Sequence, residues 1–389
     1  MVLVDVPFAS RIWALPVLTA LTPSKAWSER HGRHHRPVTE WARLVLLTLR
    51  RWLPDRSIVA VMDGEFAALE FLHALRASMV VIARLCKDAR LFDPPPCHDD
   101  KPGRAPRKGK RQPLLSERLT DPATRWQRVV QASRTSWRSA GWIEYAHGTA
   151  LWHHGGKPIV PILWVLVRYP DGRREPEAFL CTDTEASPRD VLDCFDRRWA
   201  METTYEEARA HLGVETQRQW SDPAIFRTTP LLLGLYSVIT LYVHQNAERL
   251  ALSPRRAAWY PKPAPTFADA LARLRQHLWF ERIVMSAEST DMTRSLPPAM
   301  QRIIEAACYA PMPSQAQLSP PEMGKVEASS LVLAVLPKYA LNQSAPAATR
   351  PSVNGRKPGC GPLARKARSR YCERRWSRRE LRSPRQGAA

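Results

Sequence analysis

The stretch from Phe195 to Arg209 reads FDRRWAMETTYEEAR and decides how the rest of the sequence is interpreted. Steps of three, four and seven residues place an aromatic ring, two guanidinium groups and a carboxylate on one helical face. The residues on this face are Phe195, Arg198, Glu202 and Arg209. A carboxylate between two guanidinium groups can hold a metal ion while the arginines grip phosphate. Arginine and glutamate four residues apart are also common on exposed helices, so the spacing alone leaves an ordinary ion-pair face open.

The segments around this helix alternate between strand and helix patterns. Ser187 is the expected N-cap of the helix, and Pro188 suits its first position. Residues 149–181 have a β texture with a hairpin turn at Tyr169–Gly172. Further upstream, expected helices at 39–52 and 66–75 alternate with expected strands at 57–62 and 79–84. This succession predicts an α/β fold.

Asp63 directly follows the apolar run 57–62, at the carboxyl end of an expected buried strand. Taken alone, an acidic residue in this place is an ordinary turn residue. Asp183 also follows a strand, but it lies in the turn before the Ser187 cap, so we expect a structural role for it.

Phe195, Arg198, Glu202 and Arg209 together resemble the Tyr-Arg-Glu-Lys signature of DDE transposases of bacterial insertion sequences. Phe195 takes the place of Tyr, and Arg209 takes the place of Lys. The segments 211–222 and 227–230 are also similar to that family, and the resemblance runs from residue 1 to about Tyr309. It implies an RNase H-like mixed sheet flanked by helices, with an all-β insertion before the helix that carries Glu202.

The resemblance also implies DNA transposition by metal-dependent strand cleavage and strand transfer. Such chemistry needs carboxylates that converge on two divalent ions, and oxygen ligands select Mg2+ or Mn2+. Asp63 resembles the second aspartate of the family, so Asp63 and Glu202 are the expected catalytic metal ligands. Phosphate or DNA contacts are expected from Arg198, Arg209, Phe195, Lys108, Lys110 and Arg111, the last three from a basic loop.

The first aspartate of the family has no clear counterpart. Counting strands back from Asp63 makes residues 1–8 the third strand of the RNase H-like order, and Asp5 is the only early candidate. Loss of a central strand would forfeit on the order of 10 kcal/mol, which is comparable to the net stability of a domain. The expectation is therefore a truncated, poorly folded and inactive transposase. The alternative is a noncatalytic DNA-binding remnant that inhibits the intact enzyme.

The composition fits a DNA-binding protein of the cytoplasm. The 389 residues carry a net charge of +21, which favours a polyanionic partner. Seven cysteines without a CxxC pair argue against a disulfide framework or a zinc site. The apolar run 230–243 is expected to be a buried helix too short to cross a membrane. The expected partners are DNA ends and target DNA, with a homodimer or synaptic complex.

Five regions are expected along the chain. Residues 1–90 form a partial RNase H-like core, 91–186 a β-rich insertion with a basic loop, and 187–309 the rest of the catalytic core. Residues 310–349 are a Pro/Ser/Ala-rich linker, and 350–389 a basic disordered tail with 13 Lys and Arg residues against two Glu. Translation past a lost stop codon would produce a similar tail, so its function stays open.

Overall fold

A computed structural model describes most of the first 309 residues and two short strands beyond them. The described ranges are 1–96, 106–130, 142–172, 174–216, 221–255, 262–286, 298–309, 329–330 and 334–337. All of them belong to the first of two units, Met1–Gln343. The second unit, Ser344–Ala389, and with it the expected basic tail, lies outside the described residues.

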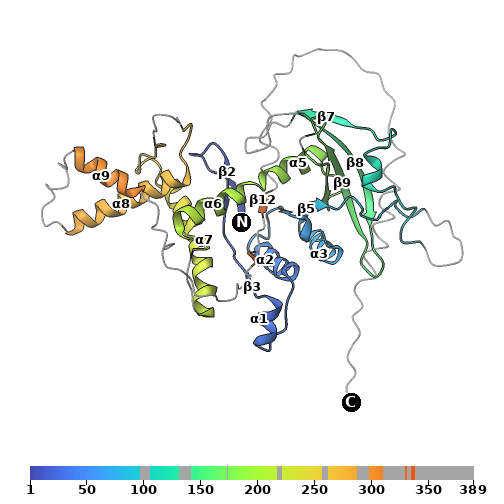
Figure 1. Ribbon diagram of the computed structural model, residues 1–389, viewed down its shortest axis with the longest axis horizontal. Coiled ribbons are helices and arrows are strands. Elements are labelled where there is room, and N and C mark those ends of the chain that lie inside the picture. Colours follow the sequence, from blue (N-terminus) through green and yellow to red (C-terminus); the bar gives the residue numbers. More distant parts are fainter. Residues whose placement is uncertain are drawn as a thin grey trace, which may run out of the picture. The chain divides into compact units, whose positions relative to one another are not determined.

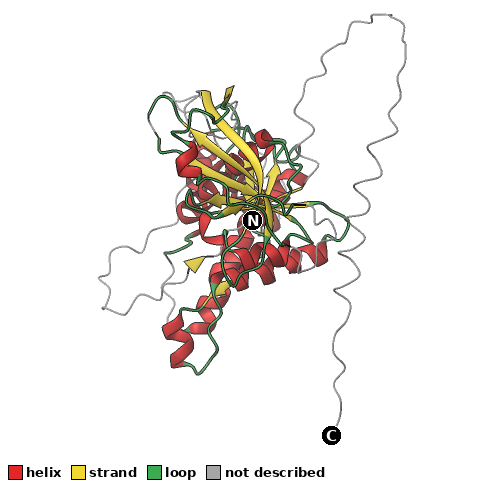
Figure 2. Cartoon of the chain, turned by 90° about the vertical axis from the view of Figure 1, so that its right-hand side faces the viewer, coloured by secondary structure: helices red, strands yellow, loops and turns green. Residues whose placement is uncertain are grey.

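Ten strands form one mixed sheet in the order β2-β1-β12-β4-β5-β10-β9-β8-β6, with β7 paired to β8. The strands are β1 (Val2–Asp5), β2 (Ile12–Leu15), β4 (Ile58–Met62), β5 (Val80–Leu85), β6 (Leu91–Phe92), β7 (Gln127–Val130), β8 (Trp142–Trp152), β9 (Val160–Arg168), β10 (Glu177–Cys181) and β12 (Ala334–Pro337). They fan out as one twisted sheet in Figure 2. A separate pair joins β3 (Leu21–Thr22) to β11 (Ser329–Ser330).

Helices cover both faces of this sheet, which confirms the expected α/β fold. Every residue of β4 is buried, as a strand covered on both sides requires. Ile58, Ala60 and Met62 pack with helices α2 (Val38–Trp52) and α3 (Leu69–Leu75). Val59 and Val61 pack instead with α5 (Pro188–Arg197) and α6 (Ala200–Leu212). Figure 1 shows α2 and α3 on one side of the strands and α5 on the other.

The first two strands lie one position away from the expected place. β1 and β2 form an antiparallel pair at the end of the sheet, with β2 outermost. The outermost position is that of the third strand in the RNase H-like order, so β2 takes it and β1 takes the second. Assigning residues 1–8 to the third strand was therefore wrong, because Ile12–Leu15 was not recognised as a strand.

The position between β1 and β4 is taken by β12. Residues Ala334–Pro337 pair antiparallel with β4 and parallel with β1. The expectation that β4 would have unpaired backbone groups on this side was wrong, since β12 supplies the partner. β11 and β12 also place strand structure inside the range 310–349 that was expected to be a linker; the rest of that range lies outside the described residues.

The strands of residues 91–186 extend the same sheet rather than forming a separate one. β10 pairs antiparallel with β5, and β9 and β8 follow as a long antiparallel hairpin. Two short helices, α1 (Lys25–Arg30) and α4 (Leu115–Arg118), lie in the connections. The hydrophobic contacts of β10 on both faces show that these strands share the core of β4 and β5.

Three further helices pack beside β1 and β2. They are α7 (Asp222–Gln245), α8 (Phe267–Ser286) and α9 (Pro298–Cys308). Trp13 of β2 is fully buried among Tyr236 of α7 and Phe267 of α8, whose rings stack at 4.0 Å. At 24 residues, α7 is longer than the expected helix over 230–243, and it is long and apolar enough to cross a membrane. The expectation of a buried helix holds for one face of α7 only, because the other face is exposed.

Candidate active site

Asp63 lies at the carboxyl end of β4, on the face of the sheet covered by α5 and α6. Successive residues of a strand point to opposite faces, so Asp63 shares its face with Val59 and Val61. Its carboxylate accepts a hydrogen bond of 2.8 Å from the backbone N–H of Gly64, at the start of the short 3-10 helix Gly64–Phe66. Asp63 is exposed, so its remaining oxygen lone pairs face solvent at the edge of the sheet.

The expected signature helix is present as two helices that meet at Arg198 and Trp199. Both residues keep right-handed helical dihedrals. The backbone hydrogen bonds at this junction connect residues three apart, as in a 3-10 helix. These bonds run from Arg198 N–H to the Phe195 carbonyl at 3.2 Å and from Met201 N–H to the Arg198 carbonyl at 3.0 Å. Glu202 therefore lies in the first turn of α6, where the helix dipole favours a negative charge.

Three polar contacts fix α6 against β2 and α7. The Glu207 carboxylate accepts hydrogen bonds from the guanidinium of Arg11 at 2.7 Å and from the hydroxyl of Tyr236 at 2.7 Å. The hydroxyl of Thr204, which is fully buried, donates to the carbonyl of Ala14 at 2.9 Å. Thr204 and Glu207, which lie close to Glu202 in the sequence, therefore fix the position of α6.

The negative charge of Asp63 acts on the carboxylate of Glu202. The pKa of Glu202 is raised, chiefly because burial removes water from its carboxylate. The positive charge of Arg198, whose Nη2 lies 3.3 Å from Glu202 Oε1, works against this rise, and the negative charge of Asp63 adds to it. Helix α6 covers the face of β4 to which Asp63 belongs, so the charge of Asp63 reaches Glu202 although the two residues are distant in sequence.

Arg84 of β5 lies beside these carboxylates and was not recognised from the sequence. Met62 is in register with Ala83, which makes Asp63 level with Arg84. The Arg84 guanidinium contacts the ring of Phe195 at 5.9 Å and bonds to the Glu177 carboxylate at 2.7 Å. Arg84 could have been recognised in the sequence as the one charged residue of the otherwise apolar strand VVIARL.

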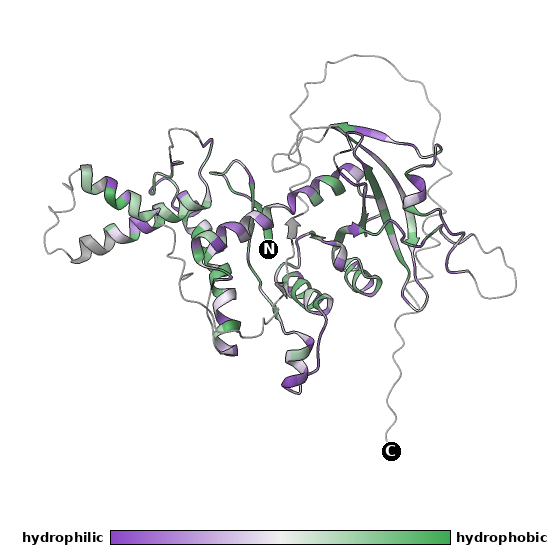
Figure 3. Ribbon diagram, viewed as in Figure 1, coloured by the Kyte–Doolittle hydropathy of each residue, from purple (hydrophilic) through white to green (hydrophobic). Residues whose placement is uncertain are grey.

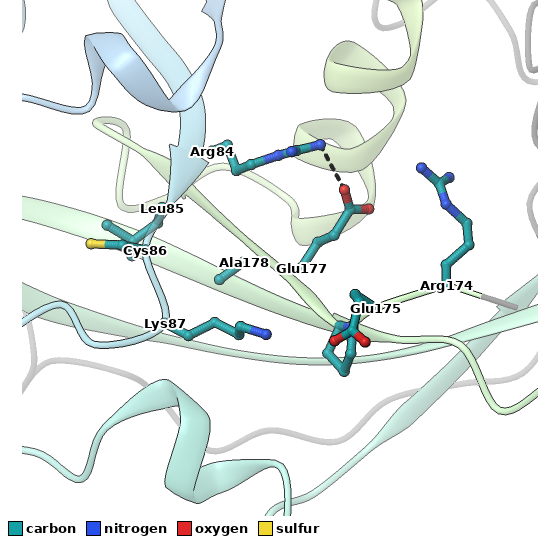
Figure 4. Close-up of a pocket in the computed structure, with 9 residues that line it drawn as sticks. Arg84, Leu85, Cys86, Lys87, Arg174, Glu175, Glu177 and Ala178 are labelled. Carbon is teal, nitrogen blue, oxygen red and sulfur yellow. Dashed lines mark hydrogen bonds and ion pairs between the residues drawn. The ribbon is translucent and has the colours of Figure 1, made fainter. Parts of the chain in front are cut away.

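A cavity of about 300 Å³ opens next to Arg84, between the ends of β5 and β10. Figure 4 shows Arg84 and Arg174 on either side of Glu177. Lys87 lines the same cavity, and the carboxylate of Glu177 also accepts a hydrogen bond of 2.6 Å from the Tyr169 hydroxyl. Three cationic side chains around one opening make a surface suited to phosphate.

Phe195 and Arg209 are placed differently from the expectation. Phe195 is only 4% exposed and packs on Phe179, with ring centroids 4.5 Å apart, and the guanidinium groups of Arg84 and Arg198 lie over its ring. Arg209 lies two turns beyond Glu202, about 10 Å along α6, and forms an ion pair of 2.6 Å with Glu215. Of the two signature arginines, only Arg198 contacts Glu202.

The basic loop residues lie at the far edge of the sheet. Lys108 is 3.7 Å from the ring centre of Phe92, and Arg111 forms a β-bridge with the same residue of β6. Five strand spacings separate β6 from β4, which is about 24 Å. The structure therefore does not bring Lys108, Lys110 and Arg111 together with Asp63.

The other acidic candidates lie toward the opposite edge. β1 runs antiparallel to β4, and the register places Asp5 about 20 Å along the strands from Asp63. Asp183 is level with Val59, and its carboxylate accepts a hydrogen bond from Glu185 N–H at 3.1 Å, as a turn residue does. Within the described residues, no group of three or more His, Cys, Asp or Glu side chains could hold a metal ion.

Comparison with known proteins identifies the fold that carries this site. Residues 4–149 match the family model of the DDE superfamily endonucleases. Over this range the chain is similar to the DDE superfamily, which supports a DDE transposase-type protein. The match includes Asp63 and ends within β8, so it does not reach Glu202. A comparison with curated proteins finds no match.

The mixed sheet flanked by helices is consistent with the RNase H-like fold of the DDE superfamily. The matched endonuclease family implies DNA as the substrate. Nucleases of this superfamily generally use divalent metal ions. Asp63 and Glu202 offer oxygen donors of the kind that Mg2+ and Mn2+ prefer.

Proposed function

We propose that this DDE-type protein cleaves DNA strands and transfers their ends, with Asp63 and Glu202 as metal ligands. The observation that carries the proposal is the placement of Asp63 at the end of β4 and of Glu202 in the first turn of α6, the helix that covers the same face of the sheet. The effect of the Asp63 charge on Glu202 supports it. A bound Mg2+ or Mn2+ would activate a water or a 3′ hydroxyl and stabilise the leaving oxygen. Like-charged carboxylates are costly to hold together without a cation, so their proximity supports this use.

The arginines around the carboxylates have separate roles in this proposal. Arg198 orients the Glu202 carboxylate through its 3.3 Å contact. Arg84, with Lys87 and Arg174 around the neighbouring cavity, binds a phosphate of the DNA strand. Lys108, Lys110, Arg111 and Arg209 contact the DNA backbone farther from the reacting phosphate.

A noncatalytic role is the second candidate. Two carboxylates meet at the site, while Asp5 and Asp183 lie toward the other edge, and no third acid joins them within the described part of the chain. DDE chemistry uses three acidic ligands. A protein with two of them would bind DNA ends without cutting them and would compete with an intact transposase.

The experiment measures metal binding and cleavage in the same set of variants. The full chain is compared with Asp63→Asn, Glu202→Gln and, as a matched control, Asp183→Asn. Mg2+ and Mn2+ are expected to raise the melting temperature of the wild type and of Asp183→Asn but not of the other two. Cleavage of duplex DNA that carries the element ends, lost in Asp63→Asn and Glu202→Gln, supports the enzyme. Metal binding and DNA binding without cleavage support the noncatalytic candidate.

Equal metal-induced stabilisation of all four proteins would overturn the proposed site.

We further propose that the protein acts in the cytoplasm, on the nucleoid, and that two copies meet in a synaptic complex. The net charge of +21 supports binding to DNA there, because each phosphate contact releases counterions. This part is tested by the salt dependence of DNA binding, which should weaken steeply between 50 and 200 mM salt.

A further inference from the structure

A cationic cavity lies between α8, α9 and the segment 246–255 that follows α7. Its volume is about 550 Å³, which is within the range of pockets that hold small molecules. Three arginines from three parts of the chain line it, namely Arg255, Arg273 of α8 and Arg302 of α9. We call it the arginine cavity. Its described lining residues include none of those that line the cavity next to Arg84, so the two openings are separate.

The arginine charges are not neutralised by acidic partners. Arg273 donates hydrogen bonds to two neutral oxygens, Gln276 Oε1 at 2.8 Å and Ser253 Oγ at 3.3 Å. Among the ion pairs of the described residues, none joins Arg255, Arg273 or Arg302 to an acidic side chain. Three guanidinium groups therefore remain available to an anion.

Hydrogen bonds from the interior hold the walls of the cavity in place. The buried Asp269 carboxylate accepts hydrogen bonds from the backbone N–H of Arg255 at 3.0 Å and from the Tyr309 hydroxyl at 3.1 Å. The guanidinium of Arg255 lies 4.8 Å from the ring centre of Tyr309. Arg275 of α8 donates a hydrogen bond of 3.1 Å to the carbonyl of Cys308, at the end of α9. A ligand would therefore meet a largely preformed site, which lowers the cost of ordering it on binding.

The lining residues of α9 and its end lie on one side of the helix. Arg302, Glu305 and Tyr309 follow one another at steps of three and four residues. Figure 3 shows hydrophilic turns between apolar ones in α8 and α9. Glu305 is the one acidic residue among the described lining residues, so three arginines and one glutamate leave a net side-chain charge of +2. This charge favours an anionic ligand.

We propose that the arginine cavity is a phosphate-binding site separate from the candidate active site. Guanidinium groups donate paired hydrogen bonds to phosphate oxygens, and three of them around one opening can bind two neighbouring phosphate groups together. A DNA strand and a free polyphosphate, such as that of a nucleotide, both present such groups. If the phosphates belong to DNA, the inference rests on the proposed function and adds a second contact to the strand.

The test is a calorimetric titration of the full chain with tripolyphosphate in EDTA and 150 mM NaCl. Arg255→Gln and Arg302→Gln should bind about tenfold more weakly than the wild type or worse, because each removes a charge-assisted contact. Glu305→Gln should bind several-fold more tightly, because a charge that repels phosphate is lost. Arg76→Gln is the matched control, since it removes one exposed arginine at the end of α3 and should bind like the wild type.

Melting temperatures check that the variants fold. Arg302 and Glu305 are exposed, so their replacement should leave the melting temperature unchanged. Arg255→Gln keeps the backbone N–H that bonds to Asp269. The gain in affinity expected of Glu305→Gln is not an effect that damage to the fold would produce.

Duplex DNA of arbitrary sequence distinguishes the two sources of phosphate. DNA that displaces tripolyphosphate, and that binds Arg302→Gln more weakly than Arg76→Gln, assigns the site to the DNA backbone. Tripolyphosphate that stays bound in the presence of saturating DNA assigns it to a free phosphorylated ligand.

Three results would overturn the proposal. They are a wild type that does not bind tripolyphosphate, Arg255→Gln and Arg302→Gln variants that bind it as tightly as Arg76→Gln, and a Glu305→Gln variant that binds it no more tightly than the wild type. The titration contains no free metal ion and needs no cleavage. Failure of the proposed site at Asp63 and Glu202 would therefore leave it unchanged, and the two proposals fail distinguishably.

Discussion

Replacement of Glu207 should both destabilise the protein and displace the helix that carries Glu202. Its carboxylate is only 15% exposed and accepts hydrogen bonds from Arg11 and from Tyr236, which is fully buried. A hydrogen bond to a charged group contributes about 1.5–3 kcal/mol, and a buried hydroxyl that loses its acceptor costs about 1–3 kcal/mol. Glu207→Ala should therefore lower the free energy of unfolding by about 3–5 kcal/mol.

Glu207→Gln provides the matched comparison. The amide keeps a carbonyl oxygen for the Tyr236 hydroxyl and loses only the charge opposite Arg11, so the expected cost is about 1–2 kcal/mol. Urea unfolding measures both values, and the melting temperature of Glu207→Ala should fall by roughly 10 °C. In Glu207→Ala, metal-induced stabilisation should also shrink, because α6 no longer holds Glu202 in place opposite Asp63.

A double-mutant cycle tests the reasoning independently. Tyr236→Phe removes the hydroxyl, so combining it with Glu207→Ala should cost about 1–2 kcal/mol less than the sum of the single changes. Strict additivity would refute the direct contact. Two results would refute the expected contribution of Glu207 to stability. One is a free energy of unfolding of Glu207→Ala within 1 kcal/mol of the wild type, and the other is a Glu207→Gln variant as unstable as Glu207→Ala.

Three other changes have definite expected outcomes. Because the pKa of Glu202 is raised in the folded protein, its ionisation opposes folding as the pH rises from the unfolded pKa through the folded one. Glu202→Gln should therefore raise the melting temperature at pH 7 in EDTA, with no gain at about pH 3; a gain that persists there would contradict this. Burial tends to raise the pKa of Asp269, but hydrogen bonds from Thr266 and Arg255 backbone N–H groups outweigh it and lower this pKa. The ionised Asp269 carboxylate stabilises the folded state above the unfolded pKa, and this stabilisation is lost as the pH falls through the folded pKa. Asp269→Asn should therefore lower the free energy of unfolding by about 2–4 kcal/mol at pH 7 and by less in acid. Urea unfolding at several pH values measures this difference. A chain that ends after residue 343 should melt like the full chain. A chain that ends after residue 328 loses β12 and about four backbone hydrogen bonds to β4, so its free energy of unfolding should fall by about 4 kcal/mol. Identical melting of the two truncated chains would exclude a stabilising role for β12.

The layers of the fold were predictable because they depend on local patterns. The five apolar residues of β4 predicted a strand covered on both faces, and both faces are covered. The helix expected at 39–52 is observed at Val38–Trp52. These elements are determined by hydrophobic periodicity, which the sequence displays directly.

Long-range pairing was not predictable in the same way. β12 follows α9 after a long stretch of sequence and pairs with β1 and β4, which lie near the other end of the chain. No local pattern specifies such a partner. Composition also failed for α7, because an apolar run shows that a helix is hydrophobic but not which of its faces another element covers.

The carboxylates of the candidate site were expected from the resemblance to the transposase signature, and their role as metal ligands stays a prediction. In the fold the charge of Asp63 acts on Glu202. Arg84 was missed because its role depends on the register of β5 with β4. Helical spacing places Arg209 on the same face as Glu202 but two turns away, where it pairs with Glu215, so its contact with DNA stays a prediction.

Metal-directed cleavage of the polypeptide tests most directly whether Asp63 and Glu202 share one metal ion, as we propose. Fe2+ bound in place of Mg2+, with ascorbate and peroxide, cuts the backbone next to its ligands. The expected result is cutting near residues 63 and 202 in the wild type and loss of both cuts in Asp63→Asn and in Glu202→Gln alike. Cutting near only one of the two residues, or cuts that survive either substitution, would contradict the shared site.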